Sequence, residues 1–167
     1  MRAAYRTNLL AILELQLCAA RNRTSTWDPW VPGPHYKWRT IINEKNEYLT
    51  DNFTLAEISC PCGNCEARID NRHLFKIQAL RDIIGKPFKV NSWFRCLTYN
   101  RTLAGSSEQS KHVFGKATDI STRGWPDDEI MNLISKAYLL GFKGIGIYPT
   151  FVHLDSREGE FRMWVGE

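Results

Sequence analysis

Hydrophobic residues recur at helical spacing in two long segments of the chain. The first covers 71–84, and four hydrophobic residues fall on one of its faces: Leu74, Ile77, Leu80 and Ile84. Gly85 follows directly, at the position where glycine most often ends a helix. The second segment starts at Pro126 with three acidic residues, which suit the positively charged end of a helix, and stops at Gly141. The pattern predicts two amphipathic helices, over 71–84 and from 126 to about 140.

Shorter helices and strands fill the rest of this region. Residues 54–57 read Thr-Leu-Ala-Glu, a capping-box pattern that predicts the start of a short helix, and another short helix is expected over 97–104. Five segments have the residue pattern of strands: 88–92, 117–121, 145–148, 151–155 and 161–165. Two of the connections are of hairpin length. The sequence therefore predicts an α+β fold, a small antiparallel sheet with helices packed on one side.

The 167 residues fit a single domain preceded by an extension. We place the N-terminal extension at 1–50 and the domain at 51–167. The extension contains a Pro/Trp-rich arm over 27–34, whose three prolines exclude a regular helix. An apolar stretch over 9–20 resembles a signal peptide, but a glutamate and a glutamine interrupt it, so a short helix is the favoured interpretation.

Charge and hydropathy exclude two classes of protein. The net charge of +4 is modest, and no block of like charges indicates a nucleic-acid-binding tail. No stretch is long and apolar enough to span a bilayer. The small positive charge suits either an ordinary solvated surface or attraction to an anionic polymer such as a cell-wall glycan.

Two histidines and an aspartate offer the ligand set of a catalytic zinc site with one position left for water. Side chains two apart on a strand share a face, so His153 and Asp155 are expected to point the same way. His112 comes shortly before Asp119, and Gly115 allows the loop between them to turn back. If the two strands are neighbours in the sheet, His112, Asp119 and His153 meet at one ion. On spacing alone, three unrelated residues are the simpler interpretation.

The motif around these residues is more specific than their spacing. Residues 110–119 read Ser-x-His-x-x-Gly-x-Ala-x-Asp, and a later strand carries His-x-Asp. This combination resembles the D-alanyl-D-alanine metallopeptidases and their hedgehog-like relatives. The segment 144–155 with the late Trp164, and Asn-Ser-Trp-Phe-Arg-Cys over 91–96, look more like the murein endopeptidases and phage-encoded lysins. The resemblance covers about residues 53–164.

The resemblance implies a hedgehog/DD-peptidase-like fold with Zn²⁺ on His112, Asp119 and His153. It also implies that Arg95 and Ser110 contact the substrate, with Arg95 holding a peptide carboxylate or the oxyanion. A guanidinium group suits this task because its planar fork of donors matches a carboxylate or developing negative charge. The simpler alternative for Arg95 is a surface salt bridge.

Two positions depart from the family pattern. Many relatives carry an Asp or Glu as general base three residues before the last histidine, where this chain has Thr150. Asp155 is then the nearest carboxylate that could serve as the catalytic base, or else it orients one of the metal ligands. Trp93 replaces a glycine of the family, which predicts a narrower or more aromatic substrate groove.

The predicted function is that of a zinc-dependent peptidase that hydrolyses peptide bonds in bacterial peptidoglycan, as a carboxypeptidase or an endopeptidase. A phage lysin is one setting for it. Its partners would be peptidoglycan stem peptides and, in a virion, phage structural proteins. It would act at the bacterial cell wall, in the periplasm, outside the cell or on a virion. The alternative is a non-catalytic zinc-binding module of a virion or tail, or one that binds the cell wall.

Four cysteines form a second candidate cluster: Cys60, Cys62, Cys65 and Cys96. The Cys-Gly-Asn-Cys spacing over 62–65 suits a zinc knuckle, and a structural zinc needs four such ligands. One or two disulfides would instead imply an oxidising compartment, and free thiols are the third interpretation. Cys18 is expected to be free. A nucleic-acid-binding zinc protein built on this cluster is disfavoured, because there is no second zinc-finger pattern and the charge is modest.

Overall fold

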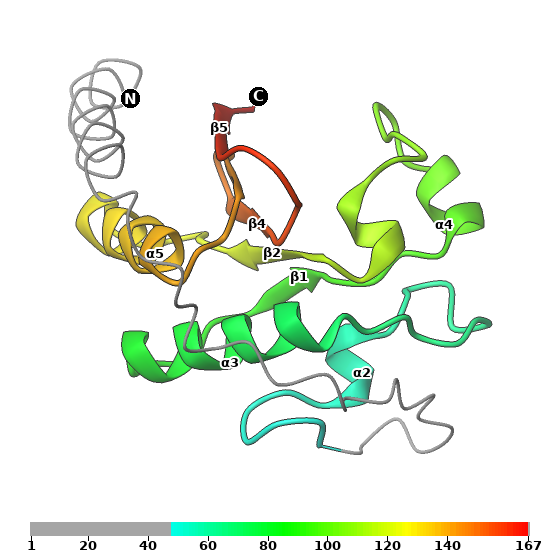
Figure 1. The fold of residues 1–167 in the computed structure, drawn as a ribbon, viewed down its shortest axis with the longest axis horizontal. Helices are drawn as coiled ribbons and strands as arrows, with labels where there is room; N and C mark the ends of the chain where they lie inside the picture. The colour runs from blue at the N-terminus through cyan, green and yellow to red at the C-terminus, as the bar shows by residue number, and fades with distance from the viewer. Residues whose placement is uncertain (1–47, 167) are drawn as a thin grey trace. The chain divides into compact units, whose positions relative to one another are not determined.

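A five-stranded sheet with the strand order β1-β2-β4-β3-β5 lies at the centre of the computed structural model, which describes residues 48–166 (Figure 1). The strands are β1 (Val90–Ser92), β2 (Ala117–Ser121), β3 (Gly144–Ile147), β4 (Phe151–Asp155) and β5 (Arg162–Val165). The helices are α2 (Leu55–Ile58), α3 (Asn71–Ile84), α4 (Leu97–Arg101), α5 (Asp127–Leu139) and the 3₁₀ helix η1 (Lys111–Phe114). None of the helices in this part of the chain is long and apolar enough to cross a membrane.

The predictions for the first 47 residues concern the short helix, the Pro/Trp-rich arm and the free Cys18. They lie outside the described residues. The division between an extension and a domain at residue 50 therefore stays a prediction.

Helices α2 and α3 begin and α3 ends where local sequence features predict. The Asp70 carboxylate accepts a hydrogen bond of 2.8 Å from the backbone N–H of His73 in the first turn of α3. Gly85 ends α3 with a φ of 70°, a left-handed conformation that glycine adopts without steric cost. Helix α2 begins at the predicted capping box. Helix α4 is shorter than predicted and ends at Arg101.

The sheet is antiparallel except at one edge. The pairs β1–β2, β2–β4 and β3–β4 are antiparallel, whereas β5 pairs with β3 in parallel. The loop after β4 carries the chain past the β3–β4 hairpin to the other edge of β3. The prediction of an α+β fold is confirmed, but the sheet is mixed, because the residue pattern of β5 does not specify which edge it joins.

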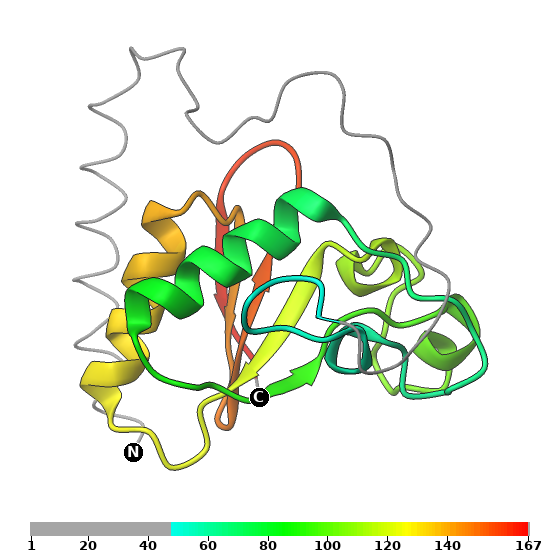
Figure 2. The ribbon, with the colours of Figure 1, turned by 90° about the horizontal axis from the view of Figure 1, so that it is seen from below.

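Helices α3 and α5 lie side by side over one face of the sheet (Figure 2). Their buried apolar side chains are Leu74, Ile77, Leu80, Leu133, Ile134 and Ala137. Ile120 of β2 and Val152 and Leu154 of β4 are fully buried. Successive strand residues point to opposite faces, so Asp119 and His153 project from the face that α3 and α5 leave uncovered.

His73 of α3 is completely buried against the sheet. Its Nδ1 lies 2.8 Å from the hydroxyl of Ser156, and its Nε2 lies 2.8 Å from the hydroxyl of Thr118 on β2. The rings of Trp93 and Phe142 meet it edge to face, with centroid distances of 5.5 and 5.6 Å. Burial lowers the pKa of His73 well below its ordinary value, so the ring stays neutral in the folded protein.

This buried neutral histidine predicts a loss of stability in acid. The unfolded chain takes up a proton on His73 near pH 6.5, while the folded chain does not. Below about pH 6.5 the unfolded state therefore binds more protons than the folded state. As the pH is lowered further, the free energy of unfolding decreases by up to about 1.4 kcal/mol per pH unit. Urea unfolding between about pH 5 and 8 should show a shallower fall for His73→Gln than for the wild type. Equal slopes for the two proteins would mean that His73 does not contribute.

Candidate metal centre

The register of β2 against β4 brings the predicted ligands together. Asp119 of β2 is paired with His153 of β4, so the two side chains stand next to each other on the same face. His112 comes from η1, which ends at Gly115 with a φ of 67°. A Cβ at this glycine would overlap the backbone carbonyl of Arg68, so both the conformation and the space require glycine. This tight turn lets the chain fold back so that His112 lies beside Asp119 of β2.

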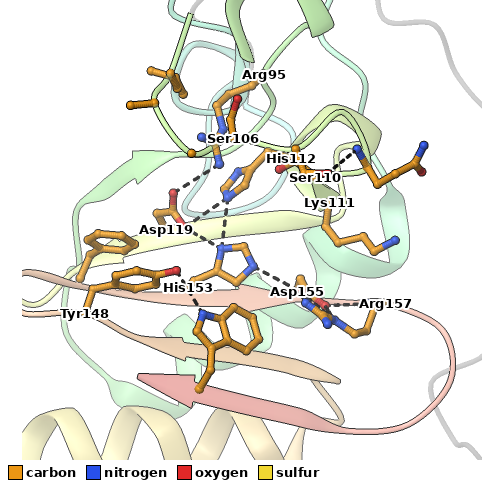
Figure 3. Close-up of a pocket in the computed structure, with 17 residues that line it drawn as sticks. Arg95, Ser106, Ser110, Lys111, His112, Asp119, Tyr148, His153, Asp155 and Arg157 are labelled. Carbon is orange, nitrogen blue, oxygen red and sulfur yellow. Dashed lines mark hydrogen bonds and ion pairs between the residues drawn. The ribbon is translucent and has the colours of Figure 1, made fainter. Parts of the chain in front are cut away.

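Three side-chain atoms converge above the sheet (Figure 3). The Nδ1 atom of His153 lies 2.8 Å from Oδ1 of Asp119 and 3.2 Å from Nε2 of His112. The Nε2 atom of His112 lies 3.2 Å from the same Asp119 oxygen. Ligand atoms held about 2.0 Å from a tetrahedral zinc are about 3.3 Å apart, so the spacing of these three atoms suits one metal ion.

The outer nitrogens of the two histidines decide which atoms face the centre. The Nδ1–H of His112 donates to the backbone carbonyl of Trp93 at 2.6 Å. The Nε2–H of His153 donates to Oδ2 of Asp155 at 3.1 Å. With protons on these outer nitrogens, each ring turns a lone pair toward the Asp119 carboxylate. Three electron-pair donors then face one point, and a cation satisfies all of them.

Burial and the interactions among Asp119, His112 and His153 set the pKa values of these three groups. Burial alone would raise the pKa of Asp119, but the two histidine rings outweigh it and hold the pKa well below its usual range. Burial lowers the pKa of His112 and keeps that ring neutral. For His153, the carboxylates of Asp119 and Asp155 outweigh burial and raise the pKa, so protons compete with a metal for this ring.

Asp155 lies on the far side of the His153 ring from Asp119 and has no exposed surface. Its Oδ1 accepts a hydrogen bond of 2.8 Å from Nε of Arg157, and its Oδ2 is shared between Arg157 and His153. Burial alone would raise the pKa of Asp155, but these partners keep it well below its usual range. Both oxygens are therefore occupied, and neither is placed among the converging ligand atoms.

Gly144 of β3 makes room for the Asp155 carboxylate. It is paired with Asp155 in the sheet, and a Cβ built on it would overlap both carboxylate oxygens. Gly146 likewise has no space for a Cβ, because the ring of Trp164 on β5 lies over it. The two glycines of β3 thus leave space on the face that carries His153, and the side chains of Asp155 and Trp164 fill it.

Replacing Gly144 with alanine should lower the free energy of unfolding by about 1–3 kcal/mol, because the new methyl group displaces the buried Asp155 carboxylate. Chemical denaturation of Gly144→Ala, Asp155→Ala and the double variant measures this coupling. The double variant should be more stable than the sum of the single effects by about 0.5 kcal/mol or more, since removing the carboxylate frees the space. Additive effects would show that Gly144 is not reserved for Asp155.

A groove of about 470 Å³ opens above the converging atoms. Arg95 lies in its wall, largely buried, with Nη2 3.8 Å from Oδ2 of Asp119. Burial lowers the pKa of Arg95, which the Asp119 carboxylate partly offsets, and its Nε has no hydrogen-bond partner. Ser110 lines the same groove directly before η1. The structure therefore brings every residue of the predicted peptidase site into one place (Figure 3).

Thr150 and Trp93, the two residues that depart from the family pattern, do not line the groove. Thr150 is not among the residues that line this groove and instead lines a separate hollow that includes Trp125. The prediction that Trp93 narrows the groove is wrong. Its ring is 1% exposed and packs in the core against Phe53, 5.6 Å between centroids, so only its carbonyl serves the site.

Two residues of the site, Tyr148 and Arg157, were not predicted from the sequence to contact the substrate or the ligands. Tyr148 lies at the end of β3 with its ring stacked on Phe151 at 4.3 Å. Its hydroxyl accepts a hydrogen bond of 3.1 Å from the indole N–H of Trp164, so its own proton is available to the groove (Figure 3). Arg157 holds Asp155. Tyr148 and Arg157 lie just beyond the ends of β3 and β4, and this position close to His153 in the sequence could have indicated them.

Two histidines and an aspartate that converge at the floor of an open groove are typical of metal-dependent hydrolases. A family model described as Peptidase M15 matches residues 51–155, more than half of the chain. The chain therefore belongs to the peptidase M15 family and is a metallopeptidase. A comparison with curated protein sequences gives no match.

Proposed function

We propose that this protein is a zinc-dependent peptidase that cuts peptide bonds in the stem peptides of bacterial peptidoglycan. The observation that carries the proposal is the convergence of His112, Asp119 and His153 at the floor of a groove whose wall holds a buried arginine. Membership of the peptidase M15 family supports the reaction class. The bond that is cut, and whether the enzyme is an endopeptidase, a carboxypeptidase or a phage lysin, follow from the substrate experiment below.

The donor set fits zinc better than a hard cation. Two neutral imidazoles and one carboxylate are typical of catalytic zinc sites, whereas calcium and magnesium prefer oxygen ligands. His112 Nε2, Asp119 Oδ1 and His153 Nδ1 would hold the ion. When bound, zinc lowers the pKa of its water toward neutrality and polarises the scissile carbonyl.

Positive side chains around the groove suit a peptide that carries free carboxylates. Arg95, Lys111 and Arg157 line it, against the carboxylates of Asp119 and Asp155. The Nε of Arg95 is buried without a partner, so a substrate carboxylate or developing oxyanion that reaches it removes an unsatisfied donor. Tyr148 can donate its hydroxyl proton to the same substrate from the opposite wall (Figure 3).

We assign Asp155 to orienting His153 rather than to accepting a proton from water. Arg157 and His153 occupy its oxygens, and the His153 ring separates it from the other ligand atoms. Within residues 48–166, Asp119 and Asp155 are the only carboxylates that line the groove. The other carboxylate oxygen near the ligand atoms, Oδ2 of Asp119, faces Arg95.

Replacing Arg95 with alanine should lower kcat/KM roughly 10²-fold on a stem peptide, since it removes a charged donor aimed at substrate negative charge. Arg95→Lys should recover only part of this loss, because an ammonium lacks the planar fork. Arg101→Ala is the matched control. Arg101 is exposed and pairs with Glu108 outside the groove, so its loss should leave kcat/KM unchanged. Unchanged kinetics for Arg95→Ala would remove Arg95 from the substrate site.

Mass spectrometry of muropeptides tests the substrate class and identifies the bond. Purified peptidoglycan is digested with the zinc-loaded protein, and the products are compared with those of a chelator-treated sample. Loss of a terminal D-alanine would define a carboxypeptidase, and shortened or unlinked stem peptides would define an endopeptidase. Intact muropeptides from a zinc-loaded sample would exclude peptidoglycan as the substrate.

One observation favours a second candidate, a zinc-binding module without catalysis. Thr150 stands where the family resemblance implies a general base in many relatives, and both oxygens of Asp155 are occupied. Such a module would bind zinc at the same three residues and would bind peptidoglycan without turnover. A co-sedimentation assay with insoluble peptidoglycan, run beside the muropeptide analysis, separates the two candidates.

A further inference from the structure

A second group of metal-ligating side chains lies outside the groove. Four cysteine sulfurs come within 4.8 Å of one another: those of Cys60, Cys62, Cys65 and Cys96. Three of them belong to the turn that follows α2, and the fourth caps the start of α4. Two segments that are separated by α3 and β1 thus meet at this cluster.

The four sulfurs form one group rather than two separate pairs, since all lie within 4.8 Å of one another. Cys62 Sγ lies 3.3 Å from Cys65 Sγ and 3.8 Å from Cys96 Sγ. All four are free thiols in the structure. In a tetrahedral zinc site with Zn–S distances of about 2.3 Å, neighbouring sulfurs are about 3.8 Å apart, close to the separations seen here.

Backbone amides add a second, independent observation. The N–H of Cys96 points at Cys60 Sγ over 3.3 Å, and the N–H of Tyr99 points at Cys96 Sγ over 3.4 Å. Such donors stabilise negative charge on sulfur, as metal-bound thiolates require. Cys60 is also buried, where an unpaired thiolate would be unstable without a cation. The surroundings therefore suit thiolates around a metal ion.

We propose that Cys60, Cys62, Cys65 and Cys96 hold a structural zinc ion, distinct from the ion at the two histidines and Asp119. The ion ties the turn after α2 to the segment that leads into α4. Four protein ligands leave no open position, so this site stabilises the fold and does not catalyse. Arg95 immediately precedes Cys96, so the same ion also anchors the backbone beside the groove.

Elemental analysis of the purified full chain tests the proposal. The wild type should carry two zinc ions per chain, and Cys65→Ser should carry one. Cys18→Ser is the matched control and should keep two. Cys65→His should also keep two, because three cysteines and one histidine still form a closed zinc site. This rescue separates ligand loss from a general effect of substitution at residue 65.

The two proposed metal sites can be tested separately, because different variants remove their ligands. His153→Ala should retain the zinc of the cysteine cluster, so one ion in this variant and none in the double variant with Cys65→Ser assigns each ion. A wild type with one zinc that Cys65→Ser does not lose would overturn the proposal. So would missing thiols in a denatured, non-reduced sample, since they would indicate disulfides. If Cys65→Ser does not fold, release of one zinc from the wild type by a thiol-specific mercurial, with the second left for a chelator, decides the question.

Discussion

Asp119→Ala should lower the rate of peptide hydrolysis at least about 10³-fold, which corresponds to about 4 kcal/mol of transition-state stabilisation. The variant should also bind one zinc ion fewer per chain than the wild type. Asp119 supplies the only carboxylate oxygen among the three converging atoms, 2.8 Å from His153 and 3.2 Å from His112. Without it, the two neutral imidazoles lack the anionic ligand that offsets the charge of the metal. His153→Ala should give the same result, because it removes the ligand atom that lies next to both Asp119 and His112.

Asp82→Ala is a suitable control for Asp119→Ala. Asp82 is an exposed aspartate near the end of α3 whose carboxylate accepts a hydrogen bond from Gln78, so its loss should change neither zinc content nor rate. Zinc is measured by elemental analysis and the rate by release of new amino groups from a stem peptide. If Asp119→Ala kept both its zinc and its rate, the proposed centre would be wrong.

Asp155→Asn should weaken zinc binding roughly 10- to 100-fold, while saturating zinc restores most of kcat. The carboxylate fixes the proton of His153 on Nε2 and so presents the Nδ1 lone pair to the metal. An amide of similar size holds the ring less firmly and can favour the opposite tautomer. The loss therefore appears in metal affinity rather than in the chemical step.

The same variant distinguishes the two roles that the sequence leaves open for Asp155. A general base would give the opposite result: unchanged zinc affinity and a large fall in kcat that added zinc does not correct. Competition with a chromophoric chelator measures the affinity, and kinetics at increasing free zinc measure the recovery. Arg157→Gln is a useful companion, because it removes the other partner of the buried carboxylate without touching His153.

The positions of the three proposed ligands follow from sequence patterns that depend on short-range geometry. Strand alternation put His153 and Asp155 on one face, and Gly115 indicated the turn that brings His112 over β2. The three residues meet only if β2 and β4 are neighbours in the sheet, which the sequence did not show. The structure pairs the two strands with Asp119 opposite His153. A single sequence does not encode strand order directly, because many registers satisfy the same alternation.

The environment of each side chain was harder to predict than its position along the chain. Trp93 was expected in the groove because it replaces a glycine of the family, yet its ring packs in the core against Phe53. A difference at one family position does not say which way the new side chain points. The pairing of Asp155 with Arg157 depends on the turn after β4, and the parallel pairing of β5 depends on a loop crossing. These are tertiary contacts, and residue patterns within one element do not contain them.

We propose above all that the His112–Asp119–His153 centre hydrolyses peptide bonds of peptidoglycan when it holds zinc. The most direct test of this proposal is the rate at which new amino groups appear in purified peptidoglycan. The rate is measured with zinc-loaded protein, with the same protein after chelation, and after zinc is added back. Hydrolysis is expected in the first and third samples, none in the second, and none with His153→Ala in the presence of zinc. Equal rates with and without metal, or no hydrolysis by wild-type protein whose zinc at this centre is verified, would contradict it.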